Sequence, residues 1–167
     1  MKQLIVLSGK GGTGKTTVAS SLVSVWDLPV IAMDLDVEEP NAGLFIRGDP
    51  VHQEEKFKMI PEWTGACSLC GLCRQVCNFH ALLQLGKEIV IFPELCHSCY
   101  ACSELCPTQS LPMIPEKMGK LREYKRDQLT FIESKLDIGQ EQAVPLIKQT
   151  LRYIDEKYRN SDFKIYD

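Results

Sequence analysis

The sequence predicts an α/β protein: a doubly wound parallel sheet, interrupted by a smaller, cysteine-rich α+β insert. Two short apolar runs, Leu4–Leu7 and Pro29–Met33, are typical of buried parallel strands, and helical periodicity follows the first of them. All eight cysteines lie between Cys67 and Cys106, in a stretch whose spacing repeats. Strand and helix patterns return near the end of the chain. The chain therefore divides into a discontinuous α/β domain and an insert.

The α/β domain is assigned to residues 1–60 and 116–167, and the insert to residues 61–115. A chain of 167 residues is long enough for both. Residues 44–61 lose the regular apolar pattern and are interpreted as a charged connection, in which His52 is a solvated loop residue. The helix after the first strand is expected to bury a face formed by Val18, Leu22, Val25 and Trp26.

The second half of the α/β domain is expected to supply a strand, a helix and a final strand. Leu129–Ser134 is the first of these and Phe163–Asp167 is the last. Residues 140–158 are periodic, but Pro145 fits only the first turn of a helix, so its start is placed near Ala143. The expected apolar face of this helix carries Val144, Ile147, Leu151 and Ile154.

The composition is that of an ordinary globular protein, with 44% hydrophobic and 25% charged residues. A net charge of −3 gives no electrostatic reason to bind nucleic acid or an anionic membrane surface. No apolar run approaches the roughly 20 residues of a membrane span. The N-terminal apolar run passes directly into Ser8–Gly12, unlike a signal peptide. We expect a cytoplasmic chain that binds neither nucleic acid nor membrane.

Residues 9–16 form a glycine-rich loop that satisfies G-x-x-x-x-G-K-[ST] at every fixed position. A preceding strand and a following helix are the context of a phosphate-binding loop, because backbone N–H groups and the helix N-terminus then surround the phosphates. Lys15 is expected to meet the β- and γ-phosphates, and the Thr16 hydroxyl to ligate Mg²⁺. A glycine-rich turn that fits by chance is the alternative. The predicted nucleotide-binding residues are Gly9, Lys10, Gly11, Gly12, Thr13, Gly14, Lys15, Thr16 and Thr17.

Two acidic residues, Asp34 and Asp36, follow the second apolar run. In doubly wound sheets, ligands bind at the carboxyl ends of the strands. Carboxylates at this end can reach Mg²⁺ or its water shell, and one of them can orient an attacking water. Taken alone, the pair could equally be the polar start of a loop. Its position after a phosphate-binding loop favours a magnesium site that includes Asp34.

The cysteines form two runs with the same C-x2-C-x2-C-x3-C spacing. Each cysteine of the second run lies 29 residues after its counterpart, as Cys96 follows Cys67 (96 − 67), which indicates an internal duplication. The second run ends in Cys106-Pro107 and resembles the signature of bacterial two-cluster ferredoxins. In that signature the fourth cysteine of each run serves the cluster of the other half. The resemblance implies two [4Fe–4S] clusters, one held by Cys67, Cys70, Cys73 and Cys106, the other by Cys96, Cys99, Cys102 and Cys77.

Three other interpretations of the cysteines compete with clusters. Zinc also takes four thiolates, but its usual sites consist of two well-separated C-x2-C pairs. Disulfides suit small secreted chains, and nothing in this sequence indicates secretion. Free core cysteines would not repeat at a fixed offset.

The insert is expected to contain a hairpin, with strands at Leu82–Leu85 and Ile89–Phe92 joined across Gly86 and Lys87. Its apolar side chains would shield the clusters from water. His80 and His97 lie beside the cysteines but break the repeat, so they are interpreted as supporting or surface residues without a ligand role. Two positions depart from the ferredoxin pattern. Asn78 replaces a proline, and Tyr100 replaces the glycine expected from Gly71, which would strain the backbone if position 100 needs a positive φ.

Residues 10–17 resemble the deviant Walker A motif of the MinD/ParA superfamily, with its additional lysine at Lys10. Residues 34–41 resemble the acidic motif of one branch, the P-loop ATPases that contain an inserted ferredoxin domain and are often labelled cobyrinic acid diamide synthase-like. Residues 90–99, 137–141 and 145–147 also resemble this branch.

The resemblance implies that ATP binding or hydrolysis switches a homodimer, while two clusters transfer electrons or serve cluster assembly. It gives Asp34 a place in the water shell of Mg²⁺. Catalytic roles fall on Lys10, which would reach the partner's ATP, on Lys15, which binds phosphate, and on Asp36, which would orient the attacking water. The partner would be a redox or cluster-accepting protein that the sequence does not identify.

The family pattern continues with a switch segment that begins at an aspartate, and Asp167 occupies that position at the last residue. We therefore expect either a chain truncated after a Walker B-like strand, with an incomplete sheet, or a chain whose sheet a partner completes. The strand at 4–7 would keep an open edge, and Leu22 and Trp26 would lose cover. Such a chain should self-associate, or its α/β domain should be markedly less stable than the insert. It should hydrolyse ATP only near background, so its status as an enzyme is left open.

Two rival functions remain. One is a simple ferredoxin-type electron carrier whose truncated nucleotide domain does not function. The other is a cluster-transfer scaffold, which would release its clusters readily to an acceptor or chelator. ATP turnover by the purified chain separates the first rival from an ATP-coupled iron–sulfur protein.

Overall fold

The computed structural model describes residues 2–46 and 48–167, and it divides into two compact units. The first unit comprises Met1–Lys56, Gly119–Asp137 and Ala143–Asp167. The second comprises Phe57–Met118 and Ile138–Gln142.

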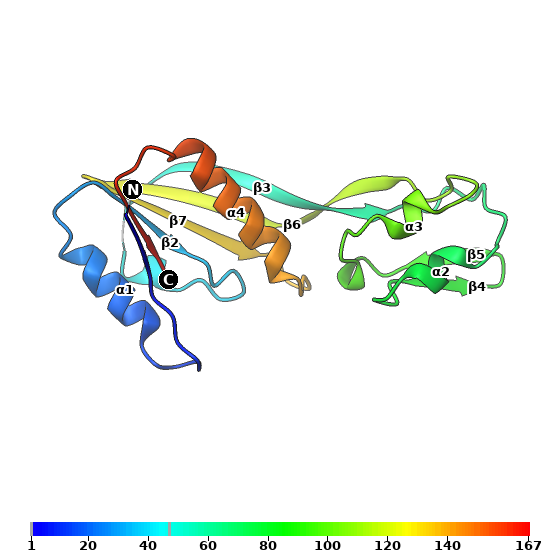
Figure 1. The fold of residues 1–167 in the computed structure, drawn as a ribbon, viewed down its shortest axis with the longest axis horizontal. Coiled ribbons are helices and arrows are strands. Elements are labelled where there is room, and N and C mark those ends of the chain that lie inside the picture. Colours follow the sequence, from blue (N-terminus) through cyan, green and yellow to red (C-terminus); the bar gives the residue numbers. More distant parts are fainter. Residues whose placement is uncertain (1, 47) are drawn as a thin grey trace. The chain divides into compact units, whose positions relative to one another are not determined.

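A six-stranded sheet has the strand order β1-β8-β2-β7-β6-β3 among the described residues (Figure 1). The pairs β1–β8, β8–β2 and β2–β7 are parallel, while β6 is antiparallel to β7. The fold is therefore mixed α/β with a mostly parallel sheet, as predicted. The strands are β1 (Lys2–Ile5), β2 (Val30–Asp34), β3 (Asp49–Pro61), β6 (Met113–Arg126), β7 (Leu129–Leu136) and β8 (Phe163–Tyr166).

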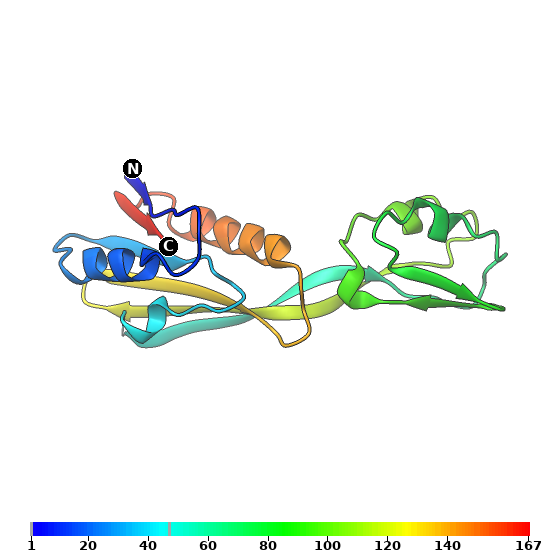
Figure 2. The ribbon, with the colours of Figure 1, turned by 90° about the horizontal axis from the view of Figure 1, so that it is seen from below.

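Both faces of this sheet are covered within the first unit, because successive residues of the buried strand β2 point to opposite sides. Val30 and Ala32 pack with α1 (Lys15–Ser24) and the segment around the 3₁₀ helix η1 (Ala42–Leu44). Ile31 and Met33 pack with α4 (Ala143–Lys157). Figure 2 shows α4 and η1 on opposite sides of the sheet.

The helices form where the periodicity predicts them, but they bury different residues. In α1, Ala19 and Val23 are buried, whereas Val18 is 58% exposed and Val25 is 78% exposed. Leu22 and Trp26 were expected to lose cover, and this is wrong. Both are half-buried against the core of the first unit, and the Trp26 ring meets that of Phe163 edge-on at 5.3 Å.

Helix α4 begins at Ala143, as predicted from Pro145. Its buried residues are Leu146, Thr150 and Ile154, whereas Val144 is exposed. The buried face of α4 therefore differs from the expected one, of which only Ile154 is fully buried. It also includes a polar residue, Thr150. The Thr150 hydroxyl satisfies its hydrogen bonds with the Leu146 carbonyl and the Ser134 hydroxyl, at 2.9 and 2.6 Å.

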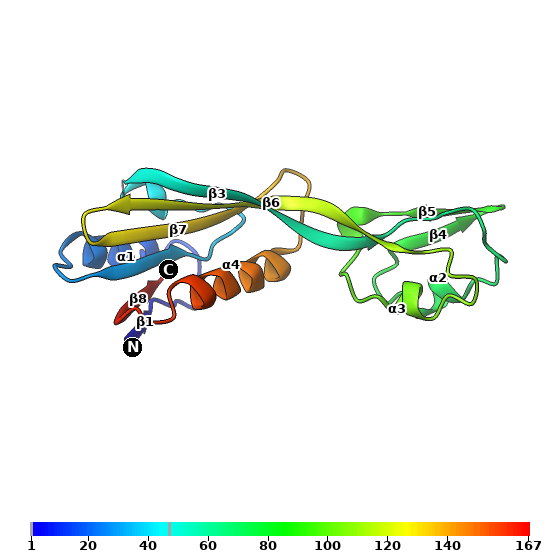
Figure 3. The same ribbon diagram turned by 90° about the horizontal axis from the view of Figure 1, so that it is seen from above.

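Strand β1 begins and ends two residues before the predicted run, and it is exposed along its whole length. It lies beside β8 at the end of the sheet (Figure 3). The expectation of a buried strand at residues 4–7 is therefore wrong. In the described part of the chain, the other edge of β1 has no neighbouring strand, so Leu4 and Ile5 remain accessible.

The predicted connection at residues 44–61 is also wrong, since most of it is the edge strand β3. Residues 49–57 of this strand are mostly exposed on both faces, so they do not need alternating apolar residues and their pattern looked irregular. His52 lies on β3, not in a loop, and its ring stacks on Tyr153 with centroids 5.6 Å apart.

The second unit contains the hairpin of β4 (Leu82–Leu85) and β5 (Glu88–Ile91), which confirms the predicted turn at Gly86 and Lys87. Helices α2 (Leu72–Val76) and α3 (Ala101–Glu104) lie over one side of the hairpin (Figures 2 and 3), and the 3₁₀ helix η2 spans Pro93–Leu95. The core of the second unit combines apolar side chains such as Ile60 and Leu111 with several of the cysteines. No helix among residues 2–46 and 48–167 is long and apolar enough to cross a membrane.

Candidate functional site

The glycine-rich loop lies between β1 and α1, at the carboxyl end of β1. Gly12 and Gly14 have positive φ angles of 74° and 88°, which residues with a side chain rarely adopt. A Cβ atom added at Gly9, Gly11, Gly12 or Gly14 would meet no atom within 4 Å, so the loop surrounds open space. The loop is braced by the hydroxyls of Ser8 and Thr13, which both donate to the Lys10 carbonyl, at 2.8 and 3.3 Å.

The predicted phosphate ligands begin α1. Lys15 and Thr16 occupy its first turn and are half-buried, while Lys10 and Thr17 are exposed. The backbone amide of Val18 donates to the carbonyl of Gly14, so the loop passes directly into helical hydrogen bonding. This is the strand, loop and helix arrangement that exposes amides to an anion at a helix N-terminus.

Asp34 is buried at the carboxyl end of β2 and is held by three backbone amides. Its Oδ1 accepts from Asp36 at 2.9 Å, and its Oδ2 accepts from Asn41 and Ala42 at 2.9 and 3.0 Å. Burial raises the pKa of the Asp34 carboxyl, these amides oppose the shift, and the charge of Asp167 adds to it. The carboxylate therefore organises the turn between β2 and η1.

Asp36 lies in this turn and is exposed. Its carboxylate accepts a hydrogen bond from the Glu39 amide at 3.2 Å, so it stabilises the local turn. In the described residues, no hydrogen bond or ion pair joins Lys10, Lys15 or Thr16 to Asp34 or Asp36. The structure therefore leaves the predicted catalytic roles of Lys10, Lys15 and Asp36 untested.

Asp167 is a site residue that the sequence analysis did not assign. Its backbone pairs with the end of β2, through hydrogen bonds from Asp167 to Met33 and from Leu35 to Asp167 of 2.9 and 3.0 Å. Its charge acts on Asp34, and its Oδ1 atom is buried without a hydrogen-bond partner. Its place after the apolar strand pattern at 163–166 was the available signal. Two neighbouring carboxylates with an unsatisfied oxygen fit a hydrated Mg²⁺ ion.

All eight cysteines in the second unit are free. The pKa of the Cys73 thiol is raised, chiefly by burial, with a backbone hydrogen bond opposing the shift and Cys67, Cys70 and Cys106 adding to it. The pKa of the Cys102 thiol rises to about 11, again chiefly by burial and then by the charges of Cys96, Cys99 and Cys77. The pKa of Cys73 is thus raised by Cys106 and that of Cys102 by Cys77, in each case the fourth cysteine of the other run.

Backbone amides donate to sulfur at equivalent positions of the two halves. The Ala81 amide donates to Cys77 Sγ and the Ser110 amide to Cys106 Sγ, both at 3.3 Å. The duplication also appears in the backbone, because positive φ angles recur in three pairs of positions with the repeat offset. The pairs are Leu69 and Ser98, Gly71 and Tyr100, and His80 and Gln109.

Lys58 is a second residue that the sequence analysis missed. It is 3% exposed on β3, and its ammonium group donates to the Pro93 carbonyl at 2.7 Å. Burial lowers the pKa of Lys58, and the charge of Cys96 opposes that shift. Burial raises the pKa of the Cys96 thiol, and a backbone hydrogen bond from Ser98 and the charge of Lys58 oppose that rise. No signal pointed to Lys58, since β3 was interpreted as a connection.

The expectation that His80 and His97 have no ligand role stays a prediction. The His97 ring stacks on Phe79 with centroids 3.7 Å apart, and His80 is exposed. Among residues 2–46 and 48–167, no group of three or more His, Cys, Asp or Glu side chains could hold a metal ion. In a [4Fe–4S] cluster each cysteine binds a different iron, so its ligands are spread more widely than those of one ion. The donor chemistry of the two cysteine sets fits such clusters, and the assignment remains a prediction.

The family comparison covers nearly the whole chain. The model of the CobQ/CobB/MinD/ParA nucleotide binding domain matches residues 4–165. The chain belongs to this family. A CobQ/CobB/MinD/ParA nucleotide-binding domain accounts for the glycine-rich loop after β1 and for the acidic turn after β2.

Two relatives come from Methanocaldococcus jannaschii, and both are described as uncharacterized. The chain is 27% identical to protein MJ0579 over 157 residues, covering 92% of this chain and 56% of that protein. It is 34% identical to protein MJ0578 over 97 residues, covering 56% of this chain and 34% of that protein. The chain thus spans about half or less of the length of these relatives. No solved structure gives a significant match.

Proposed function

We propose that this chain is an ATP-binding iron–sulfur protein, in which a CobQ/CobB/MinD/ParA nucleotide-binding domain carries an inserted ferredoxin-like domain with two [4Fe–4S] clusters. The proposed domains are residues 1–60 with 116–167, and residues 61–115. The observation that carries the proposal is the grouping of the free cysteines. Cys77 of the first run lines one pocket together with Cys96, Cys99 and Cys102 of the second run, which is the crossed grouping that the ferredoxin signature requires.

On the nucleotide side, the glycine loop offers its amides to the phosphates, and Lys15 adds a positive charge. Thr16 would ligate Mg²⁺, with Asp34 and Asp167 in the water shell of the ion. The unsatisfied Oδ1 of Asp167 supports this assignment, because buried carboxylate oxygens rarely lack a partner.

On the cysteine side, one cluster would be held by Cys67, Cys70, Cys73 and Cys106 and the other by Cys96, Cys99, Cys102 and Cys77. When bound, such clusters supply one-electron redox chemistry. The backbone amides of Ala81 and Ser110 would stabilise negative charge on sulfur, and Lys58 would offset it near Cys96.

The nucleotide site and the clusters would be coupled, because they occur in one chain. Nucleotide binding or hydrolysis would govern electron transfer or cluster assembly with a partner protein. The open edge of β1 supports self-association, because unpaired strand edges bind other strands. Lys10, which is exposed, is then free to reach a nucleotide on a second copy. Light scattering at increasing concentration tests self-association, and a monomer throughout would count against it.

Calorimetric titration of anaerobically prepared protein with Mg²⁺ and a non-hydrolysable ATP analogue tests the nucleotide site. Lys15→Ala should weaken binding at least tenfold, roughly the loss of one charge-assisted hydrogen bond, with iron content unchanged. Lys148→Ala, on the exposed side of α4, is the matched control. Equal affinity in wild type and Lys15→Ala would refute the site. A nucleotide-free but iron-loaded protein would instead favour the simple electron carrier.

A further inference from the structure

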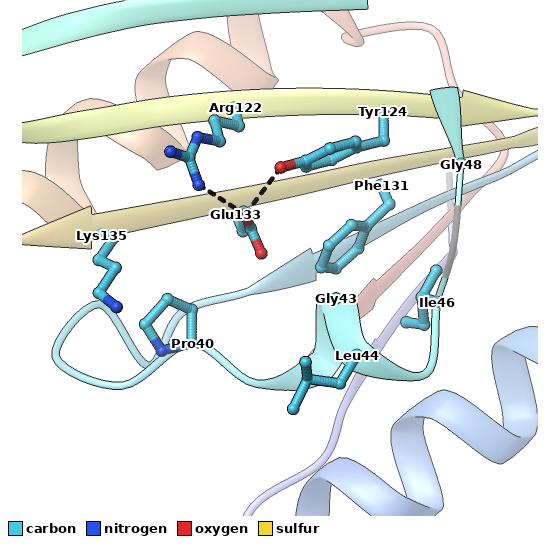
Figure 4. Close-up of a pocket in the computed structure, with 10 residues that line it drawn as sticks. All are labelled: Pro40, Gly43, Leu44, Ile46, Gly48, Arg122, Tyr124, Phe131, Glu133 and Lys135. Atoms are coloured by element: carbon cyan, nitrogen blue, oxygen red, sulfur yellow. Dashed lines mark hydrogen bonds and ion pairs between the residues drawn. The ribbon is translucent and has the colours of Figure 1, made fainter. Parts of the chain in front are cut away.

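A cavity of about 440 Å³ lies in the first unit, on the sheet face that η1 covers. One wall consists of β6 and β7 side chains, and the other is formed by Pro40, Gly43, Leu44, Ile46 and Gly48 (Figure 4). Its volume is within the range of small-molecule pockets. The predicted nucleotide, magnesium and cysteine residues do not line it.

The carboxylate in this cavity is already satisfied. Glu133 is only 13% exposed, and its Oε1 accepts a hydrogen bond of 3.0 Å from the Tyr124 hydroxyl. The Arg122 guanidinium is 3.7 Å from the same oxygen and is 42% exposed, so it can meet a second anion. Lys135 reaches the cavity from β7, apart from Arg122 (Figure 4). Two cations and one carboxylate leave a net positive charge on the described lining residues.

The rest of the cavity is apolar. Phe131 is 2% exposed, and its ring stacks near that of Tyr124 with centroids 5.9 Å apart. Leu44 and Ile46 lie on the opposite wall (Figure 4). The cavity therefore has a cation-rich end and an apolar end. These two ends are complementary to a small molecule that carries an anionic group on an apolar body.

The wall at Gly43 is held close to Glu133. A Cβ atom at position 43 would lie 2.8 Å from Glu133 Oε2 and 3.3 Å from a ring carbon of Phe131. A side chain at position 43 would require Glu133 or Phe131 to shift. The segment therefore packs closely over these two side chains.

The same segment is tied to the candidate magnesium site. Asp34 Oδ2 accepts hydrogen bonds from the amides of Asn41 and Ala42, which directly precede Gly43. The cavity wall and the position of the Asp34 carboxylate therefore belong to one turn. A ligand in the cavity has a short, hydrogen-bonded route to Asp34.

We propose that this cavity binds a small organic anion, a carboxylate or phosphate group on an apolar or aromatic body, and that its occupancy changes the affinity of the chain for nucleotide. The anionic group lies between Arg122 and Lys135, and the body lies against Phe131. The linkage to nucleotide rests on the proposed function, whereas binding of the anion does not. By thermodynamic reciprocity, nucleotide changes the affinity for the anion by the same factor.

The test uses benzoate and phenyl phosphate as probes and benzyl alcohol as the neutral comparison. Binding to the full, cluster-loaded chain is measured without nucleotide by calorimetry and by the backbone amide NMR signals of Ala42 and Gly43. At least one anionic probe should saturate and shift both signals, with benzyl alcohol about tenfold weaker. Lys135→Gln and Arg122→Gln should each weaken the probe about tenfold, and Lys148→Gln should not.

No saturable binding by either anion, or equal binding in Lys135→Gln and wild type, would overturn the pocket. If the probe binds as described, nucleotide affinity is then measured with the cavity saturated, and a change of at least about threefold is expected. An unchanged nucleotide affinity would overturn the linkage alone. Anion binding to a chain that binds no nucleotide would refute the proposed function and leave the cavity assignment standing.

Discussion

The Oδ2 atom of Asp34 accepts a hydrogen bond of 3.0 Å from the backbone amide of Ala42. This bond joins the end of β2 to the start of η1 and is buried. Two amides, those of Asn41 and Ala42, point at one carboxylate oxygen. The turn therefore depends on an acceptor at this position, in addition to any role of Asp34 near Mg²⁺.

Asp34→Asn is expected to disturb both the turn and the metal site. If the amide NH₂ group takes the place of Oδ2, it faces two backbone donors, which should lower the free energy of unfolding by about 1–3 kcal/mol. Magnesium-dependent nucleotide affinity should fall at least about tenfold. Asp27→Asn is the matched control, because that carboxylate is exposed and lies outside this turn. Wild-type stability and Mg²⁺ dependence in Asp34→Asn would contradict this assignment.

Glu123 ties α4 to β6 in the first unit. This carboxylate is 1% exposed and accepts hydrogen bonds from Tyr153 and Lys157 at 2.6 Å and from Tyr158 at 2.5 Å. Burial alone would raise its pKa, but the three hydrogen bonds outweigh it and hold the pKa of Glu123 below the ordinary 4.5. A carboxyl with a lowered pKa stabilises the fold above its unfolded-state pKa, and this stabilisation is lost as the pH falls through the folded-state value.

Glu123→Gln should therefore lower the free energy of unfolding by about 2 kcal/mol at pH 7, mostly through the tyrosine bonds, because Lys157 is 42% exposed and screened. The difference from wild type should shrink as the pH falls below about 4.5. Urea unfolding can be followed by Trp26 fluorescence in a Trp63→Phe background, since the chain has two tryptophans. Glu156→Gln is the exposed control. A difference that does not depend on pH would contradict the role of the charge.

Tyr100 has a φ angle of 64° at the position that corresponds to Gly71, whose φ is 76°. The predicted departure from the repeat therefore leaves a tyrosine in a strained, left-handed conformation at the start of α3. Its ring lines the pocket that contains Cys77, Cys96, Cys99 and Cys102.

Replacing Tyr100 by alanine removes the ring and keeps the strain, whereas replacement by glycine removes both. Tyr100→Gly should therefore be about 1 kcal/mol more stable than Tyr100→Ala. Both variants should lose iron to a chelator faster than wild type, because the ring no longer excludes water. Chelator kinetics and urea unfolding of the cluster-loaded variants measure the two effects. Equal stability of the two variants would show that position 100 is not strained.

The sequence predicted the glycine loop, β2, the hairpin and the start of α4 because each has a strong local signal. Strands β3 and β6 lack such a signal, since charged residues cover much of β3 and only tertiary pairing extends β6. Helix faces were misjudged because Val18 and Val25 are apolar yet exposed.

Residues that act through register could not be found from sequence. Arg122 faces Glu133 and Tyr124 faces Phe131 only because β6 and β7 pair in antiparallel register. Lys58 and Asp167 likewise gain their roles from neighbouring strands and loops. The two cysteine runs could be found from the sequence alone, because their spacing repeats along the chain.

Iron and sulfide analysis of anaerobically reconstituted protein tests the two-cluster account most directly, when it is applied to paired cysteine variants. Wild type should hold about eight iron and eight sulfide per chain. Cys106→Ser should hold about four of each, and adding Cys67→Ser should remove no more, because both residues serve one cluster. Adding Cys77→Ser to Cys106→Ser should instead remove nearly all. Zinc in place of iron would contradict the account. The crossed assignment would be contradicted if Cys67→Ser/Cys106→Ser lost all its iron while Cys77→Ser/Cys67→Ser kept about four iron per chain.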